Sequence, residues 1–311
     1  MKTFVRVAEV WVPSADGSLL ELSDGLFDTA PAFGALSRRM CFGRSEGLPG
    51  RAWDEGRPLL LNRFEGSYFR RTTAAQAAGL HAAIALPVFV HQRLTSVVVL
   101  MCGESAEHVG AIELWHNNPR ITTDLRLADG YFGSTEPALE TLTRDGSLPR
   151  GAGLPGLAWQ RDAAVFMDQL AEAPRFLRKE QAAQAGIVRG LALPCATRGS
   201  NDHWVLTLLS SAKTPIARRV ESWSPVGEGG AHLQRAFGWC ETGGTLPVGP
   251  SSMRTLDDLG PVGQSWRSGV AQVGHCGQSA FWISQPASLS SVLAMPVVND
   301  GVVSEVLALY Y

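Results

Sequence analysis

Five cysteines are spread along the chain, and their spacing limits the chemistry that thiols could supply. They are Cys41, Cys102, Cys195, Cys240 and Cys276. A structural zinc site needs closely paired ligands, and no Cys-x-x-Cys pair occurs. The odd number also argues against a framework of disulfides. We therefore expect reduced, mostly buried thiols and no metal site.

A Gly-x-x-Gly-x-x-Trp pattern, called the box below, could hold a phosphate or line a pocket. It occurs at residues 47–53, 153–159 and 260–266. A phosphate-binding loop needs Gly-Lys-Ser/Thr after its glycines, which the box lacks. We expect a tight loop that follows a short helix. Trp53, Trp159 and Trp266 either line a ligand pocket or lock the loop onto the core, and the core interpretation is favoured because large aromatic side chains dominate core energetics.

Aromatic side chains lie next to arginines in two alanine-rich stretches. Phe69 precedes Arg70, and Phe176 lies two residues before Arg178. These four are the best pocket candidates, although an aromatic core residue beside solvated arginines explains the pattern as well. The predicted ligand-binding residues are Trp53, Phe69, Arg70, Trp159, Phe176 and Arg178.

No arrangement of residues points to catalysis. The sequence contains no HExxH helix, no paired carboxylate cluster and no Ser-His-Asp pattern. His81 and His203 stand alone, and a lone histidine is more often a hydrogen-bonded filler than a base or ligand. We predict no catalytic residue.

Composition narrows the classes of partner. The 311 residues are 45% hydrophobic and 18% charged, with a net charge of −2. This is enough apolar material for packed cores, and there is no basic excess to neutralise phosphates. We expect no signal peptide at the start of these residues, and no apolar run is long enough to span a membrane. We expect a cytoplasmic protein that binds neither nucleic acid nor membrane.

Four landmarks recur in the same order in three copies, although the third copy keeps little of one of them, and this indicates an internal repeat. Besides the box and the alanine-rich stretch, they are a Glu-x-Trp motif and an apolar strand with a proline. The Glu-x-Trp motif occupies residues 9–11, 113–115 and 221–223, and the strand occupies 85–88, 192–195 and 294–297. A period near 105 residues suits a whole domain. We predict domains at 1–104, 105–212 and 213–311, each with a separate core, the third having lost the alanine-rich stretch.

Hydrophobic periodicity and turn residues predict the elements of the first copy. Strands are expected at 4–12, 19–22, 58–61, 82–90 and 94–101, and helices at 33–41 and 67–78. Pro87 requires an edge position or a bulge in its strand. The fold class is α+β, with helices flanking a central antiparallel sheet in each of three tandem domains.

The ordered set of box, aromatic-basic helix ending in glycine, and Ala-Leu-Pro-Val strand resembles the GAF domain family. Copies one and two match all of these motifs, and the third departs at the helix. The resemblance implies a pocket between sheet and helical cover that holds a small molecule in some members. It also implies a sensory role through an output domain, often as a homodimer. Neither long connecting helices nor an output module is expected within these residues, so a separate output protein is the expected partner.

Three functions stay open at this point. The first is a non-enzymatic sensor that binds an unknown small molecule, in the first two copies if anywhere. The second is a scaffold whose pockets are filled by side chains, a reading suggested by the third copy. The third is a reductase of free methionine sulfoxide, an activity that some GAF-like proteins have and that would use two cysteines such as Cys41 and Cys102. A covalent bilin is not expected, because no Cys-His pair occurs and the nearest sequence is the reversed His275-Cys276.

Overall fold

The computed structural model describes residues 2–103, 108–135, 137–198, 202–227, 229–277, 281–282 and 285–311. These residues form three antiparallel sheets with short helices. We call each sheet with its helices a unit. The first unit contains β1 (Val5–Pro13), β2 (Leu19–Leu26), α1 (Pro31–Ser37), β3 (Cys41–Gly43), α2 (Gly47–Glu55), β4 (Leu59–Leu61), α3 (Thr72–Ala77), β5 (Leu80–Val90) and β6 (Arg93–Gly103).

The other two units repeat this order with changes in the third. The second unit contains β7 (Gly110–Asn117), β8 (Leu125–Tyr131), α4 (Pro137–Asp145), β9 (Ser147–Leu148), α5 (Gly153–Arg161), β10 (Val165–Met167), α6 (Lys179–Gln184), β11 (Ile187–Cys195) and β12 (His203–Ser211). The third contains β13 (Arg219–Val226), β14 (His232–Cys240), β15 (Gly244–Thr245), a 3-10 helix η1 (Gly249–Ser252), β16 (Arg254–Thr255), α7 (Pro261–Ser268), β17 (Gln272–His275), β18 (Ser291–Asn299) and β19 (Val302–Tyr310).

The first two sheets have the same strand order, β3-β2-β1-β6-β5-β4 and β9-β8-β7-β12-β11-β10. The third has seven strands, with the order β15-β14-β13-β19-β18-β17 and with β16 pairing with β14 as β3 pairs with β2. In each sheet the unit's first strand pairs with its last. The predicted antiparallel sheets are therefore present, and the predicted ends of the strands in both hairpins of the first copy lie within four residues of the observed ends.

The box is helical, which corrects its expected place in a loop. It forms the first two turns of α2 and α5 and covers the start of α7. Its first glycine has a positive φ, +57° at Gly47. Its second glycine lies against backbone, because a Cβ on Gly50 would come 2.0 Å from the carbonyl oxygen of Gly43. The two glycines thus seat a helix directly on the preceding segment.

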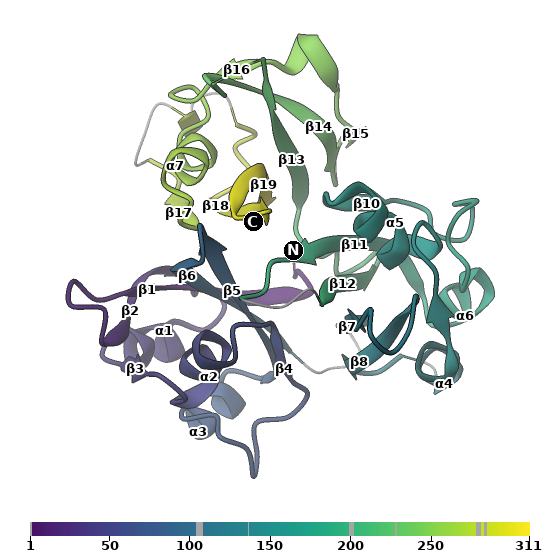
Figure 1. Ribbon diagram of the computed structural model, residues 1–311, viewed down its shortest axis with the longest axis horizontal. Coiled ribbons are helices and arrows are strands. Elements are labelled where there is room, and N and C mark those ends of the chain that lie inside the picture. Colours follow the sequence, from purple (N-terminus) through teal and green to yellow (C-terminus); the bar gives the residue numbers. More distant parts are fainter. Residues whose placement is uncertain are drawn as a thin grey trace.

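Each sheet buries both of its faces, and the two faces have different partners. The outer face of every sheet packs against its own helices and covering segments, around Trp11, Trp115 and Trp223. The inner faces of the three sheets meet in one shared cluster that includes Leu86, Leu193 and Met295. In Figure 1 the helices lie at the periphery and strands of all three units converge on the centre. The expectation of three separate cores holds for the outer faces and is wrong for the inner ones.

The proline of each landmark strand lies at the centre of this arrangement. Pro87, Pro194 and Pro296 line one small space of about 30 Å³. The short strands beside them, β4, β10 and β17, do not reach the prolines. Their pairing ends two residues before each proline, at Ala85, Ala192 and Ala294. The missing N–H therefore falls where the strand is already an edge, as the sequence predicts for Pro87.

The units contact one another head to tail in a closed ring. At each junction the carbonyl oxygen of the left-handed residue that ends the box helix accepts a hydrogen bond from a neighbouring hairpin. Gly56 accepts from the Arg198 N–H (2.9 Å), Asp162 from Asn299 Nδ2 (2.9 Å), and Gly269 from Thr95 Oγ1 (2.6 Å). The cycle from first to second to third and back to first unit closes, as a heterologous interface can when its rotation is right.

A second contact occurs at two junctions and is replaced at the other. The Ala271 N–H donates to Ser96 Oγ (3.3 Å), and the equivalent Ala164 N–H donates to the Glu305 carboxylate. Pair registers place Pro58 at the donor position of the first unit and Trp204 at the acceptor position of the second. There the guanidinium of Arg57 lies 5.1 Å from the centre of the Trp204 ring instead.

Glu305 makes the junction between the second and third units sensitive to pH. Burial raises the pKa of this carboxyl, against the hydrogen bonds from Ala164 and Ser222 that lower it. The folded state therefore holds its proton to higher pH than the unfolded chain, and stability is lost as pH rises above about 4.3, the usual glutamate pKa, toward the raised value. We expect Glu305→Gln to gain thermal stability relative to the natural chain as pH rises from 4 to 7. Melting curves across this range test it, with the exposed Glu172→Gln as control; a difference that is constant with pH contradicts it.

Candidate functional site

The Glu-x-Trp motif of the first unit binds a buried arginine between sheet and helices. Two residues apart on β1, Glu9 and Trp11 point to the same face, and the indole Nε1 donates to the carboxylate at 3.0 Å. Arg71, at the start of α3, places its guanidinium on both carboxylate oxygens, with Nη2 at 2.9 Å, and donates to Ser37 as well. Both charged side chains are almost wholly buried, at 1% and 0% exposure.

The second unit repeats this arrangement residue for residue. Trp115 Nε1 donates to Glu113 at 3.0 Å. Arg178 Nη2 lies 2.8 Å from the same carboxylate, and Nη1 donates to Thr143, which replaces the serine of the first unit. A buried ion pair with all these hydrogen bonds avoids the cost of an unpaired buried charge. The motif is therefore a structural anchor in these two units.

Side chains occupy the place where the resemblance implies a pocket in the first two units. The Arg71 guanidinium lies 4.5–5.7 Å from the ring centres of Trp11, Phe33, Phe42 and Phe69. Arg178 lies similarly over Trp115 and Phe176, at 5.6 and 5.5 Å. These two arginines thus fill the space between each sheet and its helices.

The predicted ligand-binding residues fall into different surroundings. Trp53, Phe69 and Phe176 are buried in the outer-face cores, and Phe69 stacks on Phe64 at 4.1 Å. Arg70 is exposed and pairs loosely with Glu46 at 3.6 Å.

Arg71, not Arg70, is the equivalent of Arg178. Arg71 lies eight residues before Gly79 (79 − 71), as Arg178 does before Gly186 (186 − 178). Counting back from these glycines would have found it.

The third unit keeps the carboxylate and changes what surrounds it. Glu221 accepts from Trp223 Nε1 (3.1 Å) and from the Tyr310 hydroxyl (2.9 Å). Its cations come from the sheet, with Nε of Arg219 at 3.0 Å and Nε of Arg235 at 2.7 Å. Between β17 and β18, the described residues 276–277, 281–282 and 285–290 form no helix like α3 or α6.

A cavity of about 560 Å³, the third-unit cavity, lies where α3 and α6 bring their arginines in the other units. Its walls include Trp223, Tyr310 and Phe281 as aromatic surfaces and Glu221 with its two arginines as the charged floor. Arg254, Asp257 and Asp258 lie at its exposed side. This is the size and mixture of surfaces that small-molecule sites have.

Burial and ion pairing determine the protonation states of Arg219 and Tyr310 in this cavity. Burial alone would lower the pKa of Arg219, but Glu221 beside it leaves that pKa raised. Burial, with the carboxylate next to it, raises the pKa of Tyr310 well above its usual value. Tyr310 therefore stays a neutral donor and Arg219 stays charged at neutral pH. The floor offers charge and hydrogen-bond donors rather than a free base.

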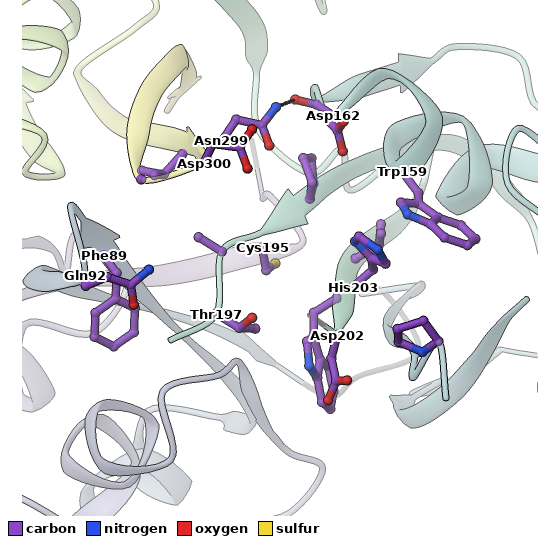
Figure 2. A pocket seen from close by; sticks show the side chains of 17 residues that line it. Phe89, Gln92, Trp159, Asp162, Cys195, Thr197, Asp202, His203, Asn299 and Asp300 are labelled. Atoms are coloured by element: carbon purple, nitrogen blue, oxygen red, sulfur yellow. Dashed lines mark hydrogen bonds between the residues drawn. The ribbon is translucent and has the colours of Figure 1, made fainter. Parts of the chain in front are cut away.

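A second cavity, of about 490 Å³, lies where the three units meet (Figure 2). Phe89 comes from the first unit, Trp159 and His203 from the second, and Asn299 from the third. Figure 2 shows the Asn299 amide bonded to the backbone of Asp162, which is the junction contact already described. Trp159, predicted to line a pocket inside its own unit, is buried in the outer-face core of the second unit and also borders this cavity, where its ring centre lies 5.2 Å from that of His203.

The groups around this second cavity are poorly suited to acid–base or thiol chemistry. Burial lowers the pKa of His203, so the ring is neutral at pH 7. Burial raises the pKa of Cys195 to about 12, so its thiol stays protonated, whereas a nucleophile must be a thiolate.

Cys41 and Cys102, the pair considered for a reductase, lie apart. Cys41 is exposed on β3, and Cys102 is buried in the shared inner cluster on β6. Three strand spacings of ~4.8 Å separate these strands in the order β3-β2-β1-β6, about 14 Å. A disulfide needs Cα atoms within about 7 Å, so this pair cannot close without rearrangement.

Two further features bear on function within the described part of the chain. It contains no cluster of three or more His, Cys, Asp or Glu side chains placed to hold a metal ion. None of its helices is long and apolar enough to cross a membrane.

Comparison with family models finds no match, and neither does comparison with curated proteins. Among solved structures the chain is similar to the A. aeolicus nlh2 GAF domain (20% identity, 33% of this chain and 60% of the other, TM-score 0.26). It is also similar to the free methionine-R-sulfoxide reductase of Neisseria meningitidis (17%, 34% and 53%, TM-score 0.25) and to a GAF domain/HD domain protein of Geobacter sulfurreducens (12%, 34% and 65%, TM-score 0.26).

The resemblance to GAF domains seen in the ordered motifs thus has counterparts among solved GAF structures. The chain spans 53% to 65% of the length of these structures, each of which covers about a third of it. At 12% to 20% identity this similarity bears on the fold alone.

Proposed function

We propose that this chain is a cytoplasmic, non-enzymatic sensory protein of three GAF-like domains, divided at 1–104, 105–212 and 213–311, that binds a small molecule and acts through a separate partner protein. The third-unit cavity carries this proposal. It lies at the position of the Glu-x-Trp motif that the first two units fill with their own arginine. Binding is thereby assigned to the third unit, where the sequence pattern is least regular.

The saturated floor of the cavity supports binding over catalysis. The Glu221 carboxylate accepts from two arginines, an indole and a phenol, so both of its oxygens are already engaged by donors of the protein. A general base must be able to take a proton from the substrate near the working pH.

A scaffold role for the first two units is the second candidate, and one observation favours it. Arg71 and Arg178 occupy the space between sheet and cover, and each is tied to a buried carboxylate. In this reading the first two units hold the third in the ring and shape its surroundings. The reductase alternative finds no support in the positions of Cys41 and Cys102.

Ligand-induced stabilisation tests the proposal. Purified protein is screened by thermal shift against cyclic nucleotides and small organic metabolites. A ligand that binds only the folded state at 100 times its Kd adds about 2.7 kcal/mol, which raises the melting temperature as ligand concentration rises. We expect Arg235→Met to abolish this response, because it removes part of the cavity floor while Arg219 still pairs with Glu221.

Arg70→Met is the matched control, since Arg70 is an exposed arginine of the first unit and a predicted pocket residue. It should leave the response intact. A response that Arg70→Met removes and Arg235→Met retains would place the site in the first unit. No response to any compound would contradict the proposal.

A further inference from the structure

Three sheet positions that are apolar in the first two units are polar in the third, and all three line its cavity. Strand registers show the equivalence. Arg219 pairs with Tyr310 where Val7 pairs with Met101. The second unit has Ala111 and Leu209 at the same two positions.

The third polar position is Arg235. It pairs with Trp223 just after a shift in register, as Leu22 does with Trp11 and Leu127 with Trp115. Polar groups at buried positions cost stability unless they are paired, so their gathering around an open cavity points to a ligand.

The charges of this floor do not cancel. In the first two units one guanidinium faces one carboxylate, as in Arg71 with Glu9. In the third unit Arg219 and Arg235 both face Glu221, and the two arginine side chains are 12% and 11% exposed. The floor therefore carries one excess positive charge in a place with little water to screen it.

The two arginines also keep donors for a further acceptor. A guanidinium has five N–H groups. In the described residues, Arg219 gives three to Glu221 and Gln285, and Arg235 gives two to Glu221 and the Pro247 carbonyl. A carboxylate is the planar acceptor that such pairs of N–H groups fit.

The remaining walls set the shape of the rest of the ligand. The rings of Phe281 and Tyr310 lie nearly parallel, with an interplanar angle of 21° and centroids 6.4 Å apart, and Trp223 lies on the same side of the sheet. Aromatic walls of this kind favour a flat apolar body. The exposed side of the cavity carries Arg254 and two aspartates, Asp257 and Asp258. Asp257 forms an ion pair with Arg267, so the charges of Arg254 and Asp258 remain and cancel.

We infer that the third-unit cavity takes a small organic monocarboxylate with a flat apolar body. Its carboxylate lies against Arg219 and Arg235, and its body lies along the aromatic walls. This inference rests on the proposed function, which needs a ligand in the cavity and leaves its chemistry open.

Three isosteric probes separate charge from shape: benzoate, benzamide and benzamidine, which carry charges of −1, 0 and +1 on the same flat frame. Binding to the full chain is measured by ligand-observed NMR and calorimetry. We expect benzoate to bind at least about tenfold more tightly than benzamide, since a hydrogen bond to a charged group contributes more than one to a neutral group, and benzamidine not to bind.

Two variants with opposite expected effects on benzoate affinity test whether the charge of the cavity floor binds the carboxylate. Arg235→Met removes the excess charge and should weaken benzoate binding at least about tenfold. Glu221→Gln keeps one acceptor oxygen, which Trp223 and Tyr310 can share as they share Oε2 of Glu221, and it removes a negative charge. It should tighten benzoate binding even if it lowers stability. Arg70→Met is the control and should change neither. Damage to the fold would weaken binding in both variants, so a tightened Glu221→Gln identifies the electrostatic effect.

The outcomes distinguish the two ideas. If benzamide or benzamidine binds as tightly as benzoate and Arg235→Met weakens it, the cavity binds ligands but the anion inference is wrong. If benzoate binds equally well to the natural chain and to Arg235→Met, the site is elsewhere and the inference is also wrong. If neither these probes nor the metabolite screen produces binding, both the inference and the proposed function are wrong.

Discussion

Replacing Arg71 with methionine should lower the free energy of unfolding by about 3–5 kcal/mol. The replacement keeps most of the side-chain volume and leaves the Glu9 carboxylate buried without its cation. The Trp11 indole remains as a donor, but it carries no charge. Urea denaturation measures the change, and Arg70→Met is the control on the neighbouring residue. Because Arg70 is 60% exposed and pairs with Glu46 at only 3.6 Å, its replacement should cost less than about 0.5 kcal/mol.

The double variant Glu9→Gln with Arg71→Met separates the pair from its parts. Removing both charges should recover much of the loss, because no uncompensated charge stays buried. A loss of the same size in Arg71→Met and in the double variant would mean that packing against Phe33 and Phe69 is the larger effect. Equal costs at Arg70 and Arg71 would contradict the anchor role.

Replacing the second box glycine with alanine should destabilise the chain by about 3 kcal/mol, the upper part of the usual range for overpacking. A Cβ at Gly263 would lie 1.9 Å from the carbonyl oxygen of Leu256, and one at Gly50 would lie 2.0 Å from that of Gly43. A backbone carbonyl cannot rotate out of the way as a flexible side chain can, so the box helix must move away from the preceding segment. The shift would also move the end of that helix, whose carbonyl contacts the next unit.

Gly243→Ala is the matched control for this experiment. Gly243 has no positive φ, and a Cβ there meets nothing within 4 Å. Its replacement should be neutral or slightly stabilising, because alanine reduces the freedom of the unfolded chain. Losses of similar size at Gly243 and Gly263 in chemical denaturation would refute the close-approach explanation of the box.

Local patterns predicted the elements well. Alternation and turn residues placed both hairpins of the first unit, and Gly79 correctly ended the alanine-rich helix region. The proline rule placed Pro87 at an edge, since the constraint on its missing N–H is local. The predicted helices came out shorter, as α1 and α3, because short helices depend on packing for their ends.

The shared inner core was not predicted, although the sequence contains a signal for it. Residues 97–102 read Val-Val-Val-Leu-Met-Cys with no alternation, which is typical of a strand buried on both faces. One face packs on the helices of its own unit. The partner of the other face depends on how whole units dock, and no local pattern encodes that.

The candidate site was harder to predict than the fold. The Glu-x-Trp motif was recognised as a repeat, but its role depends on Arg71, 62 residues away along the chain from Glu9. In the third unit, Arg219 and Tyr310 matter because they replace apolar residues at equivalent sheet positions, and only the strand registers reveal which positions those are.

The second contact between units, from a backbone N–H to a side-chain oxygen, differs from junction to junction and therefore determines which units can be neighbours. The first unit offers an acceptor in Ser96 but no donor at Pro58, the second offers a donor in Ala164 but no acceptor at Trp204, and the third offers both. Three copies of any one of the first two units would leave buried groups unmatched at every contact. Only one cyclic order of the three units satisfies all these groups, so the second contact specifies the order in which the units assemble. It also disfavours rings made of three first units or of three second units.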